Sequence, residues 1–450
     1  MSIELIALMM FASMAMLLLS GRYIFVAIGS IGIISSIALW GKGGFDMAFF
    51  SAFCFMKWYP LLAIPPFVFM GLILARSGLA DAMYEMIYRW IGRIHGGLAM
   101  GTIGVSAIIA CMVGGATCGT VTAGVIAMPS MLKRKYNKVM VTGVVQAGGA
   151  LGFLIPPSII FILYGVIARV SIGHLFLAGV IPGFMLAGMY VAYIYIRCRR
   201  NPSLAPPSTE RFTMGQKLAS TRAGIAPVML IFCVLGLLFM GVTTVMESAA
   251  VGAAGAMVCA AVYRKLNMQV IRAAMDEGLK ISCLFLWILT AAFLFAAVYD
   301  GLGGAAVLKP LLFRFENPWL IIAIMQLTFI GMGTFLDDTA MLLIVAPLYL
   351  PLVVALGFDK VWYGVLYVIT CEMAYLTPPF GYTLFIMKGL VGMKGLKKWG
   401  ITLGDIYRSV IPFVLIQAAC LGLVMAFPAL ALWLPTTFFG GTYQPMAPHW

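Results

Sequence analysis

The sequence predicts an all-α polytopic membrane protein built from two internal repeats, each with a re-entrant helical hairpin and a helix broken by a Pro-Pro pair. Three observations support this fold class. Hydrophobic residues make up 63% of the 450 residues and charged residues only 10%, and the mean hydropathy is +1.05. The two halves share residues at one constant spacing. Each half also places a Pro-Pro pair inside an apolar segment.

Long apolar runs recur from one end of the chain to the other, as expected of a helical membrane protein. The runs are continuous rather than alternating, which argues against a β-barrel. The 49 glycines fit closely packed membrane helices. The first run, Leu5–Leu19, follows Glu4 and has no basic residue before it. We therefore expect a first membrane helix here rather than a cleaved signal peptide.

The net charge of +14 comes from Lys and Arg that crowd the polar loops. The positive-inside rule accounts for this pattern and predicts that these loops are cytoplasmic. A nucleic-acid-binding role would need a polar domain to carry the charge, and the sequence contains none. The basic residues form four groups: Lys133, Arg134, Lys135 and Lys138; Arg197, Arg199, Arg200, Arg211, Lys217 and Arg222; Arg264, Lys265, Arg272 and Lys280; and Lys394, Lys397 and Lys398.

Catalytic and metal-binding patterns are missing from the sequence. Nine cysteines are scattered without paired spacing, and three histidines lie far apart, so we expect neither disulfides nor a transition-metal site. No Ser/His, paired-Asp or metal-ligand constellation indicates an intramembrane enzyme. We therefore expect no enzyme activity, no catalytic residues and no cofactor.

The longest polar stretch, residues 199–222, is interpreted as a cytoplasmic linker between an N-terminal half (1–198) and a C-terminal half (223–450). The halves match at an offset of 222 residues, for example from position 156 to position 378. Functional sites of transporters with internal repeats lie where the repeats meet. The four matches are Pro156-Pro157 with Pro378-Pro379, YNKV at 136–139 with FDKV at 358–361, Pro129 with Pro351, and Thr117 with Thr339.

Each repeat begins with an apolar segment that is interrupted, at 112–132 in the first copy and at 332–353 in the second. Two arms of about 10 residues each, at about 1.5 Å per residue, cover only about half of a ~30 Å membrane core. We therefore expect re-entrant hairpins with their tips near the midplane, and a kinked full-span helix is the alternative. The interruptions are Gly114, Gly115 and Gly119 in the first copy, and Asp337 and Asp338 in the second.

A helix broken by the Pro-Pro pair follows each hairpin, at about 138–170 and about 358–391. Proline lacks an amide hydrogen, and its ring collides with the carbonyl of residue i−4, so two in a row open a gap. Carbonyls before the gap lose their donors, which costs several kcal/mol each in hydrocarbon unless protein, water or a cation satisfies them. The negative end of the half-helix dipole also faces the gap. Each break therefore resembles a small-cation site made mostly of backbone oxygen.

The expected cation ligands are main-chain carbonyls together with one side-chain hydroxyl, that of Thr377. The half-helices that restart at Ser158 and Phe380 offer free amides, which favour an anionic group. A cation site and an anion site back to back would couple their binding. The alternative is that the Pro-Pro pairs only kink the helices for packing. The carbonyl ligands are Gly152 and Ile155 at the first break and Ala374, Thr377 and Phe380 at the second.

At these motifs the sequence resembles the large membrane subunit of the tripartite ATP-independent periplasmic (TRAP) transporters. The resemblance covers essentially the whole chain, and its motifs are specific in combination rather than singly. They are LLAIPPFVFMGLILARSGLADAM (61–83), GRIHGGLAMGTI (92–103), LGFLIPPSIIFILYGV (151–166), IGHLFLAGVIPGF (172–184), MESAAVGAAGA (246–256) and YLTPPFGYTLFI (375–386).

The resemblance implies the fold of the ion transporter superfamily, with two inverted repeats, a scaffold and a mobile transport domain. It implies elevator-like uptake of an organic anion, usually a carboxylate, across a bacterial inner membrane, with Na+ as the coupling ion. The implied partners are a small four-helix membrane subunit, expected as a separate polypeptide, and a periplasmic substrate-binding protein. A stand-alone carrier of the same superfamily, an ion channel and proton coupling are the alternatives.

Carried onto this chain, the resemblance implies two sodium sites and a substrate site. At the first hairpin tip Gly115 and Ala116 stand where the family usually has serines, so Thr117, Thr120 or carbonyls would have to take their place. The first sodium site falls on Gly114, Gly115, Thr117, Gly152, Ile155 and Pro157, and the second on Gly333, Ala374, Thr377 and Phe380. The candidate substrate-binding residues are Thr117, Ser158, Asp337, Thr339 and Pro379.

Glu372 lies five residues before Thr377 in an apolar segment. An acid at the bilayer centre costs roughly 2.5–3.5 kcal/mol on insertion scales. It is therefore expected either to bind a cation or a proton, or to face water or a basic partner.

Overall fold

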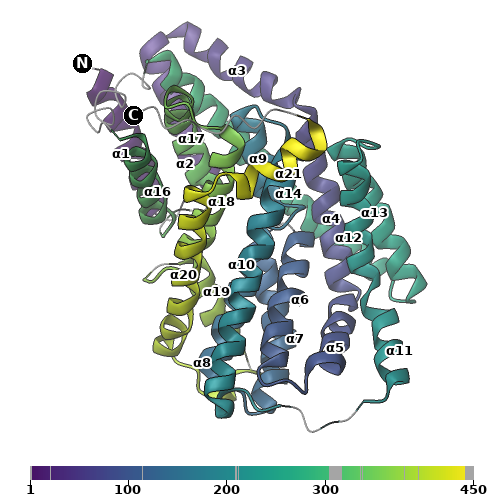
Figure 1. The fold of residues 1–450 in the computed structure, drawn as a ribbon. Coiled ribbons are helices and arrows are strands. Elements are labelled where there is room, and N and C mark those ends of the chain that lie inside the picture. The colour runs from purple at the N-terminus through teal and green to yellow at the C-terminus, as the bar shows by residue number, and fades with distance from the viewer. Residues whose placement is uncertain are drawn as a thin grey trace.

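The computed structural model describes residues 3–20, 22–113, 115–207, 210, 212–303, 317–334, 336, 338–379, 381–393 and 395–440. Within these ranges the chain forms helices joined by short turns, and no strand occurs (Figure 1). Among the described residues, five helices are long and apolar enough to cross a membrane, or six if the bent pair α11–α12 is one span. The prediction of an all-α polytopic membrane protein is confirmed.

The helices of the two halves follow one another with few residues between them. Those of the N-terminal half are α1 (Ile3–Leu19), α2 (Ile24–Trp40), α3 (Lys42–Met56), α4 (Ile64–Arg76), α5 (Leu79–Ile91), α6 (Gly97–Val113), α7 (Ala116–Lys133), α8 (Lys138–Ala150), α9 (Ile159–Ala168) and α10 (Ile172–Arg200). Those of the C-terminal half are α11 (Met214–Gly224), α12 (Ala226–Phe239), α13 (Val245–Val262), α14 (Met268–Gly301), α16 (Pro318–Gly333), α17 (Asp338–Ala355), α18 (Lys360–Leu376), α19 (Tyr382–Val391), α20 (Leu403–Ala426) and α21 (Ala429–Phe439).

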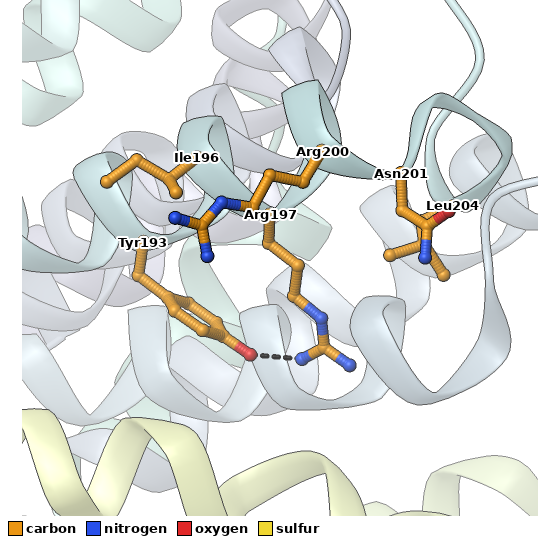
Figure 2. A pocket seen from close by; sticks show the side chains of 6 residues that line it. All are labelled: Tyr193, Ile196, Arg197, Arg200, Asn201 and Leu204. Atoms are coloured by element: carbon orange, nitrogen blue, oxygen red, sulfur yellow. Dashed lines mark hydrogen bonds between the residues drawn. The ribbon is translucent and has the colours of Figure 1, made fainter.

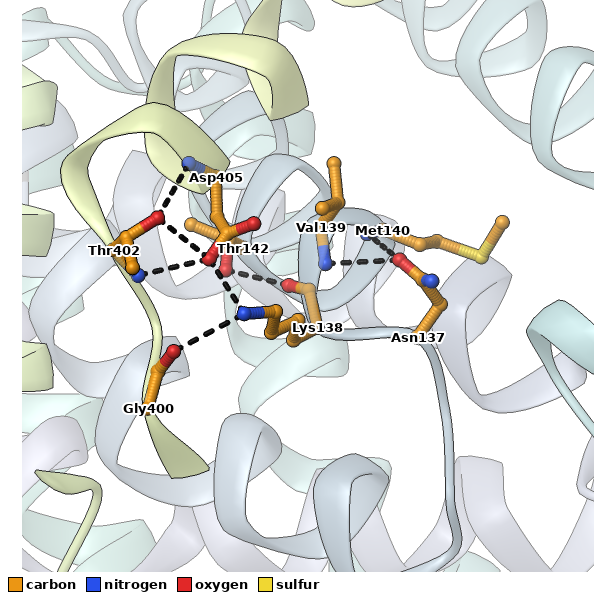
Figure 3. A network of polar contacts seen from close by, with 8 residues as sticks. All are labelled: Asn137, Lys138, Val139, Met140, Thr142, Gly400, Thr402 and Asp405. Carbon is orange, nitrogen blue, oxygen red and sulfur yellow. Dashed lines mark hydrogen bonds and ion pairs between the residues drawn. The ribbon is translucent and has the colours of Figure 1, made fainter. Parts of the chain in front are cut away.

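Three of the four basic groups lie together at one end of the molecule, which we name the linker end. The amide of Asn137, in the loop after α7, donates to the carbonyl of Leu204 in the linker (2.8 Å). The Lys138 ammonium lies between the carbonyl of Gly400 (3.1 Å) and the carboxylate of Asp405 (2.7 Å), as Figure 3 shows. The loop after α7, the linker and the turn before α20 therefore meet at this end.

The two broken helices run in opposite directions. The first leads from Lys138, at the linker end, to Ala168 at the end of α9. There the ammonium of Lys360, the first residue of α18, donates to the Ala168 carbonyl (3.2 Å), and the Tyr164 hydroxyl donates to the Lys360 carbonyl (2.7 Å). The second broken helix thus begins at the opposite end and leads back towards Gly400. The repeats are inverted relative to each other, as predicted.

The first hairpin consists of α6 and α7, and both of its outer ends lie at the linker end. The amide of Gly96, just before α6, donates to the carbonyl of Ala205 in the linker (3.3 Å). The tip lies at Gly115, whose extended backbone precedes α7. The hairpin is therefore longer than expected, because the range 112–132 holds only the tip and the second arm. Gly119 does not interrupt α7, since it serves close packing against α6.

The second hairpin consists of α16 and α17 and enters from the opposite end (Figure 1). Trp319, in the first turn of α16, packs edge-on against Phe358 and Trp362 at the start of α18, with ring centroids 5.0 and 5.9 Å apart. As in the first repeat, the expected range 332–353 holds only the tip and the second arm, and α16 supplies the first arm. Asp337 lies outside the described residues.

The connection between the two halves is shorter than the polar stretch 199–222. α10 continues through Arg200, and α11 begins at Met214 behind a capping box formed by Thr213 and Gln216. A capping box satisfies amides at a helix start that would otherwise lack acceptors. Polar composition alone therefore did not distinguish a surface helix from a loop.

The first segments of the two broken helices form the centre of the protein. Every residue from Met140 to Ala150 in α8, and from Trp362 to Leu376 in α18, is buried. A helix enclosed on all sides carries small or apolar residues around its whole circumference. The first segment leads into a buried Pro-Pro break, where irregular backbone is tolerated because other protein groups can satisfy it, and the second leads into a break that is partly exposed, with Pro379 on the surface.

Candidate functional site

The first Pro-Pro break separates α8 from α9 and is almost completely buried. After α8 the chain tightens into a short 3-10 turn, and the amides of Leu154 and Ile155 both donate to the Leu151 carbonyl (3.1 and 3.0 Å). The two prolines that follow have no backbone N–H to donate. The carbonyls four residues before them, those of Gly152 and Phe153, therefore receive no helical hydrogen bond from these positions.

Both short helices that follow the breaks begin with donor groups. α9 starts behind the buried Ser158, whose hydroxyl oxygen accepts from the Phe161 amide (3.5 Å). α19 starts after Gly381, which has no side chain that could cap the helix. The first amides of a helix lack internal acceptors and lie at the positive end of its dipole. These two helix starts can therefore bind an anionic group, whereas the ends of α8 and α18 favour a cation.

The first hairpin packs directly on the first break because glycines remove the side chains between them. A Cβ at Gly119 would lie 2.3 Å from the Cβ of Ala110, and one at Gly152 would lie 2.2 Å from that same atom. A Cβ at Gly149 would lie 2.2 Å from the hydroxyl oxygen of Thr120. The Thr120 hydroxyl is buried and has no hydrogen-bond partner among the described residues. The Thr120 hydroxyl is therefore free to bind a ligand beside the end of α8.

The second break differs from the first because its carbonyls have donors. The Ala374 carbonyl accepts from the Thr377 amide (3.2 Å), and the Tyr375 carbonyl accepts from the Thr383 hydroxyl (2.8 Å). The Thr377 hydroxyl donates to the Met373 carbonyl (2.6 Å). Each oxygen keeps a further lone pair. The Thr377 hydroxyl and the Ala374 carbonyl are therefore still able to bind a cation.

The tip of the second hairpin rests on α18 just before this break. The Tyr367 hydroxyl donates to the Asp338 carbonyl (2.6 Å), and the Asp338 amide donates to the Tyr375 hydroxyl (3.1 Å). A Cβ at Gly333 would lie 2.6 Å from the Cβ of Ala374. Two tyrosines of α18 thus hold the tip of the second hairpin against the second Pro-Pro break.

The two breaks are neighbours, because the rings of Phe153 and Tyr375 pack edge-on with centroids 5.3 Å apart. The Gly115 amide at the first tip donates to the Ala110 carbonyl of α6 (3.2 Å), and Ala110 is also the residue against which Gly152 of the first break packs. Thr339 is buried in the first turn of α17, at the second tip. The side chain of Thr117 is not among those described, and Gly114, Asp337 and Phe380 lie outside the described residues.

Sequence reasoning missed the donors that reach the second break from later helices. Thr383 follows the break within α19, and Tyr407 of α20 donates its hydroxyl to the Pro379 carbonyl (3.0 Å). Thr383 lies within the same motif as the second Pro-Pro pair, YLTPPFGYTLFI (375–386), so its closeness to the break could be predicted from the sequence. Nothing in the local sequence links Tyr407 to Pro379, because the two are 28 residues apart and meet only after α20 has folded back.

A separate pocket of about 360 Å³ lies at the linker end of α10 (Figure 2). Within it the Arg197 guanidinium donates to the Tyr193 hydroxyl. None of the predicted sodium- or substrate-binding residues lines this pocket, so the breaks remain the candidate site. Its lining residues are Tyr193, Ile196, Arg197, Arg200, Asn201 and Leu204.

The sequence matches known proteins along most of its length. Residues 10–430 match the family described as "Tripartite ATP-independent periplasmic transporter, DctM component". The chain is 32% identical over 384 residues to the C4-dicarboxylate TRAP transporter large permease protein DctM of Pseudomonas aeruginosa, covering 84% of this chain and 86% of that protein. It is 26% identical over 388 residues to the sialic acid TRAP transporter large permease protein SiaM of Vibrio cholerae, covering 85% and 87%.

The fold also resembles a solved structure, the crystal structure of the Alcanivorax borkumensis YdaH transporter, with a TM-score of 0.63. The alignment covers 90% of this chain and 91% of that chain at 14% identity, so the similarity concerns the fold alone. The family match, by contrast, runs through both hairpins and both Pro-Pro breaks. The chain therefore belongs to the tripartite ATP-independent periplasmic transporters, as their DctM component, the large permease subunit.

Proposed function

We propose that this chain carries an organic anion, most simply a carboxylate, across a bacterial inner membrane by sodium-coupled secondary uptake. Relatives are named for the transport of C4-dicarboxylates, 2,3-diketo-L-gulonate and sialic acid, all of which contain a carboxylate. The observation that carries the proposal is the pair of helix breaks placed side by side. They combine uncharged oxygens, which suit Na+, with free helix starts, which suit an anion.

At the first break, the proposed sodium ligands are the carbonyls left without a helical donor and the free hydroxyl of Thr120. This hydroxyl would replace those of the serines that are usual at the tip, because it lies against Gly149 at the end of α8. At the second break the proposed ligands are the Ala374 carbonyl and the Thr377 hydroxyl. The substrate carboxylate would lie at the starts of α9 and α19, close enough to both ions for their binding to be coupled.

The moving part in this proposal is the assembly of the two hairpins and the two broken helices, and the remaining helices form the scaffold. The linker end would face the cytoplasm, because it gathers the basic loops. A small membrane subunit and a periplasmic binding protein would complete the system. The opposite end, where α9 meets α18, would then receive the substrate from the binding protein.

The test is uptake into proteoliposomes that contain this chain, its small membrane subunit and its periplasmic binding protein. A panel of carboxylates is offered under an inward sodium gradient or an inward proton gradient. We expect uptake that needs sodium and both partners. Uptake by this chain alone would favour a stand-alone carrier, and uptake with a proton gradient alone would refute sodium coupling.

The second sodium site is tested by Thr377→Ala, which should raise the sodium concentration for half-maximal uptake several-fold. Thr436→Ala is a matched control, because the Thr436 hydroxyl makes the same type of bond to the carbonyl four residues earlier (2.9 Å) in α21. An unchanged sodium response in Thr377→Ala would contradict the second site as described.

A further inference from the structure

The pocket of about 360 Å³ in Figure 2 lies at the linker end of α10, a helix that is long and apolar enough to cross a membrane. The arginines of this helix all stand in its last turn, at Arg197, Arg199 and Arg200. At about 1.5 Å per residue, Arg197 lies about 37 Å along the helix from Ile172, just beyond a hydrocarbon core of about 30 Å. Tyr193, one turn earlier, is a residue type enriched at the boundary between hydrocarbon and water. The pocket therefore lies at the level of the lipid headgroups.

The polar groups of the pocket are mostly hydrogen-bond donors, and none is acidic. Figure 2 shows Arg197, Arg200 and Asn201 among the lining residues, which include no Asp or Glu. No ion pair among the described residues includes either arginine. The Arg197 guanidinium donates to the Tyr193 hydroxyl, and the exposed Arg200 guanidinium has no partner in the described part of the chain. A guanidinium has five N–H donors, so most of these donors are free to bind an anion.

Neighbouring elements hold the walls of the pocket in place. The Tyr193 ring packs edge-on against Phe413 of α20, with centroids 5.5 Å apart, and its hydroxyl holds the Arg197 guanidinium. On the other side, the short 3-10 turn after α10 ends at Leu204, whose carbonyl accepts from the Asn137 amide (2.8 Å). Binding to groups that are already held in position loses less conformational entropy than binding to mobile ones. The pocket is therefore organised before a ligand arrives.

The pocket also has an apolar wall that continues along α10 towards the membrane interior. Ile196 lines the pocket, and its side chain is 51% exposed. Ala192, one turn earlier, is exposed as well. Residues four apart are neighbours on the surface of a helix, so these two side chains form one continuous apolar surface. A ligand that fills the pocket can therefore extend from the arginines into the hydrocarbon, which a soluble anion cannot use.

We propose that this pocket binds the phosphate of an anionic phospholipid, with an acyl chain along the exposed face of α10. Each guanidinium can donate two parallel N–H bonds to phosphate oxygens, a geometry that arginine offers and lysine does not. Basic pockets between membrane helices bind lipid headgroups in this way. A headgroup that also carries an ammonium would place a positive charge beside Arg197 and Arg200, with no lining carboxylate to offset it. The pocket should therefore prefer phosphatidylglycerol to phosphatidylcholine. This inference does not rest on sodium-coupled uptake.

The test is native mass spectrometry of the full chain, stripped of its own lipid and titrated with either phospholipid. Wild type should bind phosphatidylglycerol more tightly than phosphatidylcholine. Arg200→Gln should weaken the binding of phosphatidylglycerol about fivefold, the contribution of one basic residue at a membrane surface, and should leave phosphatidylcholine unaffected. Arg199→Gln is the matched control, because it removes the same charge from the same turn. Arg199 does not line the pocket and donates to the Tyr195 hydroxyl instead (3.2 Å).

Three results would overturn the proposal. Equal binding of phosphatidylglycerol by wild type and Arg200→Gln would exclude the pocket. An equal loss in Arg199→Gln would indicate diffuse attraction by the basic helix end rather than a site. Inorganic phosphate that displaces phosphatidylglycerol from wild type at equal concentration would assign the pocket to a soluble anion rather than to a lipid.

Thermal unfolding gives a second measurement, in which each variant is compared with itself and a general loss of stability cancels. A ligand that binds only the folded state raises the unfolding temperature. Short-chain phosphatidylglycerol should therefore raise this temperature, relative to phosphatidylcholine of the same chain length, in wild type and Arg199→Gln. The double variant Arg197→Gln/Arg200→Gln should show no such difference between the two lipids. The same difference in all three proteins would contradict the proposal.

Discussion

Gly152→Ala is expected to disturb the first break because there is no room for even one methyl group. The new Cβ would lie 2.2 Å from the Cβ of Ala110, 2.5 Å from its carbonyl carbon and 2.8 Å from its Cα. Carbon atoms in contact are normally about 3.5–4.0 Å apart. Two of the three contacted atoms are backbone, so no side-chain rotation relieves the overlap. α6 would have to move by about 1 Å or more relative to the break.

The expected cost is about 1–3 kcal/mol of stability, the range for adding a methylene to a packed interior. Transport should suffer more than stability, because the shift separates the first hairpin from the break at which we place a sodium site. The assay compares thermal unfolding in detergent with sodium-dependent uptake in proteoliposomes. Gly188→Ala in α10 is the matched control, since a Cβ at that exposed helical glycine would meet nothing within 4 Å. Equal behaviour of the two variants would refute the reasoning.

Three further variants probe individual contacts. Thr120→Val keeps the side-chain shape but removes the free hydroxyl. The sodium concentration needed for half-maximal uptake should therefore rise, while the free energy of unfolding changes by less than about 1 kcal/mol. An unchanged sodium concentration would exclude Thr120 as a ligand. Thr383→Val removes the donor to the Tyr375 carbonyl and should cost about 0.5–1.5 kcal/mol in thermal unfolding. Lys138→Met breaks a half-exposed ion pair with Asp405, so it should cost less than about 1 kcal/mol, and less still in high salt.

The positions of the breaks could be predicted from sequence because the effect of proline is local. The missing amide and the ring collision act within four residues, so the expected ranges of about 138–170 and about 358–391 agree closely with α8–α9 and α18–α19. The hairpin arms were harder to place. Gly115 and Gly119 look equivalent in sequence, yet one turns the chain and the other lies within a helix against Ala110. Only the packing partner distinguishes these two roles.

The constant offset of 222 residues not only indicates a repeat but also identifies residues that make equivalent contacts in the two copies. Lys138 and Lys360 are equivalent by this offset, and each begins the first segment of a broken helix behind a capping residue, Asn137 or Asp359. Each lysine also donates to a main-chain carbonyl that follows or ends the broken helix of the other repeat. Inverted symmetry requires this crossing, because the start of one copy must lie where the other copy ends.

The two crossed contacts differ in a way that bears on the proposed movement of the transport assembly. At the linker end Lys138 has a carboxylate partner, Asp405, in the first turn of α20, so α20 is tied to the start of α8. At the opposite end the Lys360 ammonium bonds, among the described residues, to the carbonyl that ends α9, where the helix dipole is negative. An ion pair with a half-exposed lysine resists separation weakly, and a single charged hydrogen bond is also modest. The Lys138–Asp405 ion pair joins the proposed moving assembly to α20 of the scaffold and is weak enough to exchange in the proposed movement, whereas the Lys360 contact lies within that assembly and aligns its two broken helices.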